Sequence, residues 1–144
     1  MFFKKKRLER SPEPQIQIDL TRTYPSMSNF KGTKRLHVTV YGDIEHGMEN
    51  AASLLGEADH FDSPGTDITL TSFRYHSGTG IKIAVDGHHV GVCWGSNENE
   101  RSKEYKAAYK GTIEGLFVRI ERELVLEDPS VGFKPRPKVS LYVK

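Results

Sequence analysis

The segment at 81–94 constrains the fold most, because it predicts two antiparallel strands joined by a two-residue turn. Apolar side chains recur at every second position of 81–85, as expected of a strand with one buried face. Asp86 and Gly87 follow, and this pair favours a tight hairpin because both turn positions need a positive φ angle. A hairpin here removes the helical crossover that a parallel α/β sheet would need.

Alternating apolar residues predict further strands on both sides of this hairpin. These strands lie at 15–22, where a short edge strand is expected, and at 35–42, 67–73, 111–127 and 134–144. A short helix is expected in 47–61 with a stop at Gly56, and a second helix in 97–110, capped by Asn97 or Asn99. The side chains expected to face the core include Leu36, Val38, Ile68, Leu70, Tyr105, Ala108, Tyr109, Leu116, Val118, Ile120, Val139, Leu141 and Val143.

Many short strands with only two helices favour a mainly β fold with two short helices (α+β), arranged as a small OB-like antiparallel barrel. We expect a basic N-terminal tail and extended arm at 1–30, and a single barrel domain at 31–144. Five basic residues and one acidic residue give 1–10 a charge of +4, so the total of +2 leaves −2 for the rest. Such a tail is typical of a solvated terminus, and also of a segment that contacts nucleic acid or an anionic membrane.

The sequence lacks the features of membrane and secreted proteins. No apolar run approaches the roughly 20 residues that a membrane-spanning helix needs, so we expect no membrane partner. The basic N-terminus has no apolar stretch after it, so we expect no cleaved secretory signal. Cys93 is the single cysteine, which excludes an internal disulfide and fits a cytoplasmic protein, although a secreted cysteine-poor protein would look the same.

The histidines and acidic residues give no clear metal or catalytic motif. His88 and His89 are adjacent in an expected strand, where neighbours point to opposite faces, so the two cannot easily bind one ion. We expect both to lie on the surface of the hairpin. Asp59, His60 and Asp62 can ligate a metal or act as acid and base, but their expected loop position also fits capping and solvation. No nucleophile elbow or phosphate-binding loop is present. We therefore expect no catalytic residues, no metal and no cofactor.

Aromatic and basic residues together suggest another kind of site. Phe73, Arg74 and Tyr75 are consecutive at the exit of an expected strand, and Tyr41 and Trp94 lie at strand ends. Exposed aromatic rings on a barrel can stack bases, while basic groups hold phosphates. The same rings also fit the core or the rim of the barrel.

The run GIKIAVDGHHVGV at 80–92 resembles the HIRAN domain, a family with a small barrel related to the OB-fold. The resemblance covers 34–126. Within it, 81–85 corresponds to the strand after the central loop of the family, and 90–92 to the return strand. It implies a module found alone in bacteria and phages or fused to helicases and nucleases, which in some members binds single-stranded DNA at a free 3′ end. Where such members carry basic and aromatic residues, this chain has Asp43 and Glu45, whose carboxylates repel a phosphate backbone.

Two functions follow from these patterns. The first is a non-enzymatic nucleic-acid-binding module for single-stranded DNA or DNA ends. Its expected binding residues are Tyr41, Phe73, Arg74, Tyr75 and Lys82. A basic patch would form if Lys31, Lys34, Arg35, Arg74 and Lys82 converge. The alternative is a protein-interaction or accessory module of a bacterial or phage system, which uses a strand edge or an apolar patch to bind a protein partner or a second copy.

Overall fold

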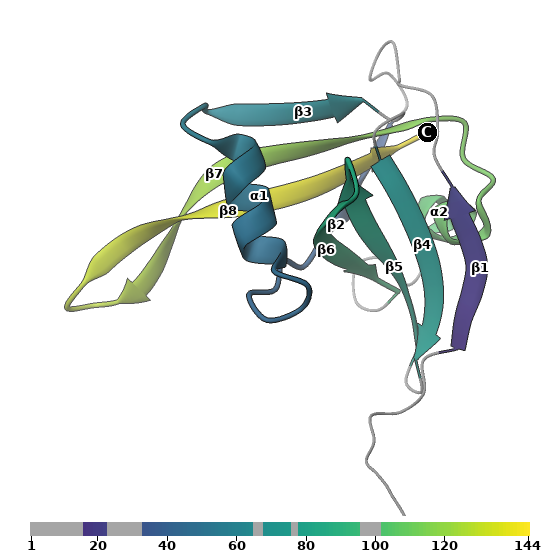
Figure 1. Cartoon of the computed structure of the whole chain (residues 1–144), viewed down its shortest axis with the longest axis horizontal. Helices are drawn as coiled ribbons and strands as arrows, with labels where there is room; N and C mark the ends of the chain where they lie inside the picture. Colours follow the sequence, from purple (N-terminus) through teal and green to yellow (C-terminus); the bar gives the residue numbers. More distant parts are fainter. Residues whose placement is uncertain (1–15, 23–32, 65–67, 76–77, 96–101) are drawn as a thin grey trace, which may run out of the picture.

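The computed structural model describes residues 16–22, 33–64, 68–75, 78–95 and 102–144. As predicted, this part of the chain is mainly β with two helices (Figure 1). The elements are β1 (Ile16–Arg22), β2 (Lys34–His37), α1 (Gly47–Leu55), β3 (His60–Pro64), β4 (Ile68–Tyr75), β5 (Gly78–Val85), β6 (His88–Trp94), α2 (Lys103–Lys110), β7 (Leu116–Asp128) and β8 (Gly132–Val143).

The strands form two antiparallel sheets of four strands each. Sheet A has the order β1-β4-β5-β6, and sheet B has the order β2-β8-β7-β3. An isolated bridge between Thr39 and Val92 links the segment after β2 to β6. The predicted mainly β class is confirmed, but the described strands do not close into a barrel, because each sheet ends in edge strands that pair on one side only.

The hairpin that was predicted at 81–94 is present between β5 and β6. Asp86 has a φ of 51° and Gly87 a φ of 84°, as a two-residue turn of this kind requires. The pairing is irregular between Ile83 and Ala84, which lie opposite Gly91 and His89. This β-bulge leaves Val90 as the extra residue in β6, and the residues from His89 to Cys93 are all buried.

The inner faces of the two sheets form the core. The largest fully buried side chains include Leu36, Ile68, Leu70, Ile81, Ile83, Leu116, Ile120 and Leu141. Alternation in the sequence predicted these positions, and the predicted inward residues of β7 and β8 are likewise buried. Ala51 and Leu55 of α1 and Tyr105 and Ala108 of α2 join the same core.

Both helices are short, at nine residues for α1 and eight for α2. Gly56, with a φ of 58°, ends α1 as predicted. The N-cap of α2 is Ser102, whose hydroxyl accepts a hydrogen bond from the backbone N–H of Tyr105 at 3.1 Å, rather than a predicted asparagine. Asn97 and Asn99 lie outside the described residues. Neither described helix is long and apolar enough to cross a membrane.

Two strand predictions need correction. The strand expected at 35–42 ends at His37, because the chain then leaves β8 and Thr39 pairs with β6 instead. The segment at 59–62, expected as a loop, is largely the edge strand β3, which pairs with β7. The edge strand expected at 15–22 is confirmed as β1, paired with β4. The rest of the expected tail, at 1–15 and 23–30, lies outside the described residues.

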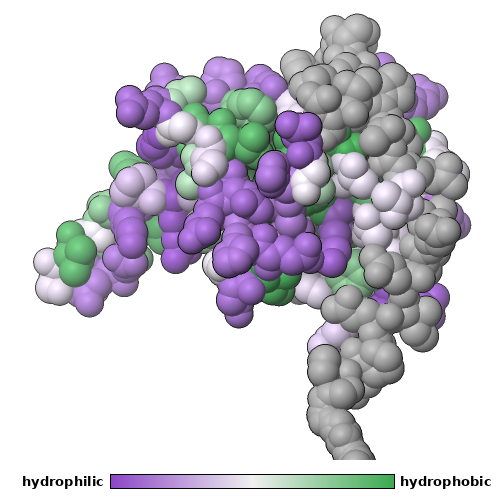
Figure 2. All heavy atoms as spheres, in the orientation of Figure 1, coloured by the Kyte–Doolittle hydropathy of each residue, from purple (hydrophilic) through white to green (hydrophobic). Residues whose placement is uncertain are grey.

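The hairpin of β7 and β8 extends past the rest of the protein as a two-stranded arm, seen at the left of Figure 1. We use "arm" for residues 121–138. The view in Figure 2 is largely hydrophilic around α1, whereas apolar surface appears at the end of the arm. Pro135 and Pro137 lie within β8 in this region. The arm thus carries side chains that the core does not cover.

Candidate nucleic-acid interface

Several of the predicted binding residues lie on one face of sheet A. In the paired strands Phe73 lies opposite Gly80, and Gly80 opposite Trp94, so the three form one row. Lys82 and Tyr75 belong to neighbouring rows of the same face, because every second residue of a strand shares a face. We call this surface the Trp94 face, formed by Phe73, Tyr75, Lys82 and Trp94.

Trp94 stands at the centre of a group of aromatic rings. Its Nε1 donates a hydrogen bond to the hydroxyl of Tyr41 at 2.8 Å. Phe73 meets it edge to face, with ring centroids 5.4 Å apart, and Tyr75 does so at 6.4 Å. The structure therefore brings together three of the predicted residues, Tyr41, Phe73 and Tyr75, around a tryptophan that was not among them.

The rings of this group differ in how much surface they offer. Phe73 is only 2% exposed, and a base cannot stack on a ring that is covered in this way. A Cβ on Gly80 would lie 2.5 Å from Cζ of Phe73 and 3.1 Å from Cε3 of Trp94, so only glycine leaves room for both rings. Tyr41, Tyr75 and Trp94 are half-buried and keep part of their surface in solvent.

Lys82 forms an ion pair within the protein. Its Nζ lies 2.8 Å from a carboxylate oxygen of Glu45, in the connection between β2 and α1. The hydrogen bond from Lys82 lowers the pKa of Glu45, so the carboxylate is charged at neutral pH. Lys82 consequently offers less positive charge to a phosphate than an unpaired lysine would.

Arg74 projects from the opposite face of sheet A. It follows Phe73 directly in β4, and successive residues of a strand alternate between the two faces. Ser72, which shares the face of Arg74, donates a hydrogen bond to the backbone carbonyl of Tyr109 in α2 at 2.6 Å. Arg74 is exposed at the end of β4 on this α2 side, so the structure does not bring it into the Trp94 face.

His89 contradicts the expectation that the hairpin histidines lie on the surface. It is 6% exposed, and a Cβ on Gly47 of α1 would lie 3.3 Å from its Cδ2. Burial lowers the pKa of His89, so the ring is neutral at pH 7. Its Nε2 is buried without a hydrogen-bond partner among the described residues. Only the tertiary packing of α1 against β6 buries this side chain, whereas His88 is exposed as expected.

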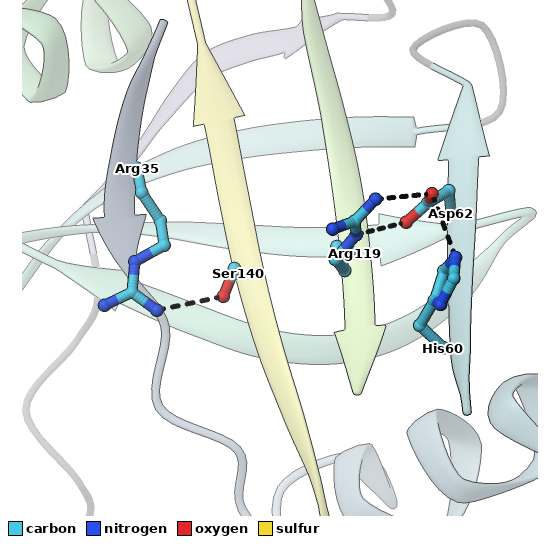
Figure 3. Close-up of polar contacts among 5 residues, drawn as sticks. All are labelled: Arg35, His60, Asp62, Arg119 and Ser140. Atoms are coloured by element: carbon cyan, nitrogen blue, oxygen red, sulfur yellow. Dashed lines mark hydrogen bonds and ion pairs between the residues drawn. The ribbon is translucent and has the colours of Figure 1, made fainter. Parts of the chain in front are cut away.

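Asp62 and His60 lie on β3 rather than in a loop. Two hydrogen bonds from Arg119 reach the carboxylate of Asp62, at 2.7 and 2.9 Å, and His60 Nε2 lies 3.6 Å from it (Figure 3). The hydrogen bonds from Arg119 lower the pKa of Asp62. The described residues contain no group of three or more His, Cys, Asp or Glu side chains that could hold a metal ion. The arrangement is therefore that of a surface ion pair across two strands.

A cationic pocket opens where β2 leaves β8. Its volume is about 220 Å³, and its lining includes Arg35 and His37 from β2, Arg136 and Lys138 from β8, and Glu123 from β7. We call it the β8 pocket. Thr39 and Ser140 add hydroxyl groups to its wall, and Arg35 Nη1 donates a hydrogen bond to Ser140 Oγ at 3.5 Å (Figure 3).

The β8 pocket has more positive charge than its single carboxylate can balance. No ion pair within 4.0 Å involves Arg35, Arg136 or Lys138 in the described part of the chain. Glu123 lies directly opposite Arg136 in the pairing of β7 with β8. Three cationic side chains therefore line one small pocket, which is the arrangement that binds an anion such as phosphate.

Most of this pocket was not predicted from the sequence, although part of its signal is visible there. Lys134, Arg136 and Lys138 alternate with prolines in KPRPKV, which places the basic groups on one face of a strand. Arg35 was expected in a basic patch with Lys82, but Lys82 pairs with Glu45 instead. The approach of Arg35 to β8 depends on a pairing of β2 with residues 140–143, which no local pattern reveals.

Comparisons with known proteins assign neither surface. No family model, no curated protein and no solved structure matches this chain. A function for this chain is therefore inferred from the Trp94 face, the β8 pocket and the arm.

Proposed function

We propose that this protein is a non-enzymatic module that binds single-stranded nucleic acid or nucleic-acid ends, with the β8 pocket as the phosphate site. The observation that carries the proposal is the convergence of Arg35, Arg136 and Lys138 without ion-pair partners among the described residues. Phosphate contacts supply most of the affinity of nucleic-acid-binding proteins, and arginine and lysine are the side chains that make them.

The position of the aromatic group supports a nucleic acid rather than a free anion. Val40 lines the β8 pocket, and the next residue, Tyr41, is bonded to Trp94. The pocket and the aromatic group are thus connected through consecutive residues of the protein chain. Base stacking on Tyr41, Tyr75 or Trp94 adds affinity without sequence preference. Single strands are favoured because their bases are free to stack.

Other features fit a binding module rather than an enzyme. Burial raises the pKa of Cys93 to about 12, so the only thiol of the chain stays protonated and is a poor nucleophile. The resemblance to the HIRAN domain, with single-stranded DNA as a ligand, is part of the same proposal. So is a cytoplasmic location, where nucleic acid and reduced cysteine are both expected.

Fluorescence anisotropy with a labelled single-stranded oligonucleotide tests the proposal. We expect binding that weakens with salt, with a slope of log K against log salt near −2 if three phosphate contacts form. The double variant Arg136→Ala/Lys138→Ala is expected to bind about tenfold more weakly at low salt and to lose roughly 1.4 from the slope. A comparison of duplexes with single strands then tests the preference for single strands. A comparison of strands with and without a terminal phosphate tests the preference for ends.

A matched control removes the same charge elsewhere. Lys103 and Lys106 are exposed on α2, so Lys103→Ala/Lys106→Ala should leave affinity and slope nearly unchanged. Arg74→Ala tests the residue predicted from the sequence, which faces the α2 side and should also have little effect. No binding at low ionic strength, or equal losses in both double variants, would exclude the β8 pocket as the phosphate site.

A second function is favoured by a different surface. The arm exposes four large apolar side chains, and an exposed apolar patch of this kind is often a protein interaction site. This observation supports the alternative of a protein-interaction module, and the two functions can coexist because the β8 pocket and the exposed apolar side chains use different residues.

A further inference from the structure

The arm carries the large apolar side chains that are most exposed in the described part of the chain. Leu124 is 65% exposed, Leu126 54%, Val131 68% and Phe133 65%. We call these four residues the arm patch. Leu126 lies opposite Phe133 in the pairing of β7 with β8, so two of them form one row across the arm, and Leu124 lies in the next row of the same face.

The arm patch continues the core face of sheet B. Ile120 lies opposite Val139, and both are buried in the core. Leu124 and Leu126 lie four and six positions after Ile120 in β7, with Arg122 between Ile120 and Leu124, and alternate residues of a strand share a face. The face that is apolar in the core therefore has further apolar side chains beyond Arg122, and there they lie in solvent. In the core other elements cover this face, whereas in the arm its apolar side chains are exposed.

Helix α1 marks where the cover ends in the described structure. Arg122 donates hydrogen bonds to the backbone carbonyls of Gly56 and Ala58, each at 2.8 Å, and so ties the end of α1 to the base of the arm. Beyond this point the apolar rows of the arm stay exposed. A two-stranded ribbon with an uncovered apolar face is only marginally stable in water, so a covering partner would stabilise it.

We propose that the arm patch is the contact through which two copies of this chain associate, with the apolar face of one arm packed on that of the other. Two sheet faces pack in this way in β-sandwiches, about 10 Å apart, with interdigitating side chains. A two-fold axis would let the same residues serve on both sides of the contact. The proposal does not depend on nucleic-acid binding.

The charges of the arm favour a second copy over a strongly charged partner. Residues 121–138 contain four acidic and four basic side chains, so the arm as a whole has no net charge that selects a polybasic or an acidic protein. Opposite charges are already neighbours within it, as Lys134 and Glu127 are at 3.7 Å. Two such arms can meet without net repulsion.

The prolines of β8 favour contact through the face rather than the edge. β2 pairs only with 140–143, so the outer edge of β8 from Gly132 to Val139 has no strand partner among the described residues. Pro135 and Pro137 lack the N–H groups that an added strand would need. Strand addition at this edge is thus disfavoured, and the exposed face is the remaining contact surface.

The size of the patch indicates a weak dimer. The four side chains expose on the order of 400 Å² in each copy, comparable to the largest apolar patch of an ordinary monomer. Burying this surface on both copies, with the residues around it, gives roughly 1,000 Å², at the lower end for specific interfaces. We therefore expect a dissociation constant in the micromolar range.

Sedimentation velocity and light scattering over a concentration series test the proposal with the full chain. We expect a monomer–dimer equilibrium. Leu126→Glu should weaken the dimer by at least about 100-fold, because the two-fold contact places two carboxylates in an apolar interface. Val125→Glu is the matched control: it introduces the same charge at the adjacent position, on the opposite face of the arm beside Lys134.

Each outcome decides the proposal. A monomer at all concentrations, or a dimer that Leu126→Glu and Val125→Glu weaken equally, would overturn it. A monomer that binds anionic phospholipid vesicles only while Leu126 is intact would assign the arm patch to a lipid surface and also overturn it. Arg136→Ala/Lys138→Ala should keep the dimer, so failure of nucleic-acid binding and failure of dimerisation are read separately. Near-native circular dichroism of Leu126→Glu would show that a loss of dimer is not a loss of fold.

Discussion

The Trp94 face and the surface of β8 contain similar kinds of side chain, but these differ in ion pairing and in burial. On the Trp94 face, Lys82 is paired with Glu45 and Phe73 is covered by its neighbours. On β8, Arg136 has no ion-pair partner among the described residues and Phe133 is 65% exposed. The difference teaches that a basic residue marks a binding surface only when the fold leaves its charge unpaired. An aromatic residue does so only when the fold leaves its ring exposed.

The largest expected effect comes from two phenylalanines in these regions. Phe73→Ala should lower the free energy of unfolding by about 3–4 kcal/mol, because it removes a buried ring and leaves a cavity beside Trp94. Phe133→Ala should lower it by less than about 0.5 kcal/mol in the monomer, because the ring is mostly in solvent. Urea denaturation at low protein concentration measures both. Equal losses in the free energy of unfolding would mean that the two rings do not differ in burial as described.

A smaller effect is expected from the two adjacent histidines. The folded state holds the pKa of His89 below 6.5, so the unfolded chain takes up a proton first as the pH falls. Stability contributed by neutral His89 is thus present above pH 6.5 and is lost progressively as the pH falls below it. His89→Gln should flatten this part of the pH profile of unfolding. His88→Gln, at an exposed position, should leave the profile unchanged.

The smallest effect is expected from Glu45→Gln. The ion pair with Lys82 is partly exposed, so its loss should cost less than about 1 kcal/mol at neutral pH. The pKa of Glu45 is lowered, so its contribution exists above its ordinary value of 4.5 and disappears as the pH falls through the lowered value. When the free energy of unfolding is measured as the pH is lowered, the variant should not show this loss of stability. Oligonucleotide affinity should change less than about threefold; a tenfold increase would show that freed Lys82 binds nucleic acid on the Trp94 face.

Much of the fold could be predicted because it depends on local patterns. The turn at Asp86 and Gly87 needs only residues that adopt a positive φ, and the buried side of β7 follows from its two-residue period. Strand β3 escaped prediction because its residues are polar and its partner is distant: Asp62 and Arg119 are 57 positions apart. An edge strand of this kind forms because it pairs with a neighbouring strand rather than because its own residues favour a strand.

The candidate site was predicted less well than the fold. Tyr41, Phe73 and Tyr75 do gather around Trp94, but one of them is buried as a core residue would be. The β8 pocket combines Arg35 with residues about 100 positions later, and Arg35 reaches Ser140 across 105 positions. No spacing rule connects such residues, so the pocket could not be found before the sheet was known.

By itself, the sequence determined where most strands and the turn at Asp86 and Gly87 form and which side of those strands is apolar, because those properties depend on neighbours along the chain. Only the tertiary structure decided that His89 is buried, that Lys82 is paired and that the apolar face of β7 and β8 continues into solvent. These outcomes depend on which distant segment lies against each side chain, and burial, ion pairing and exposure are set by that contact.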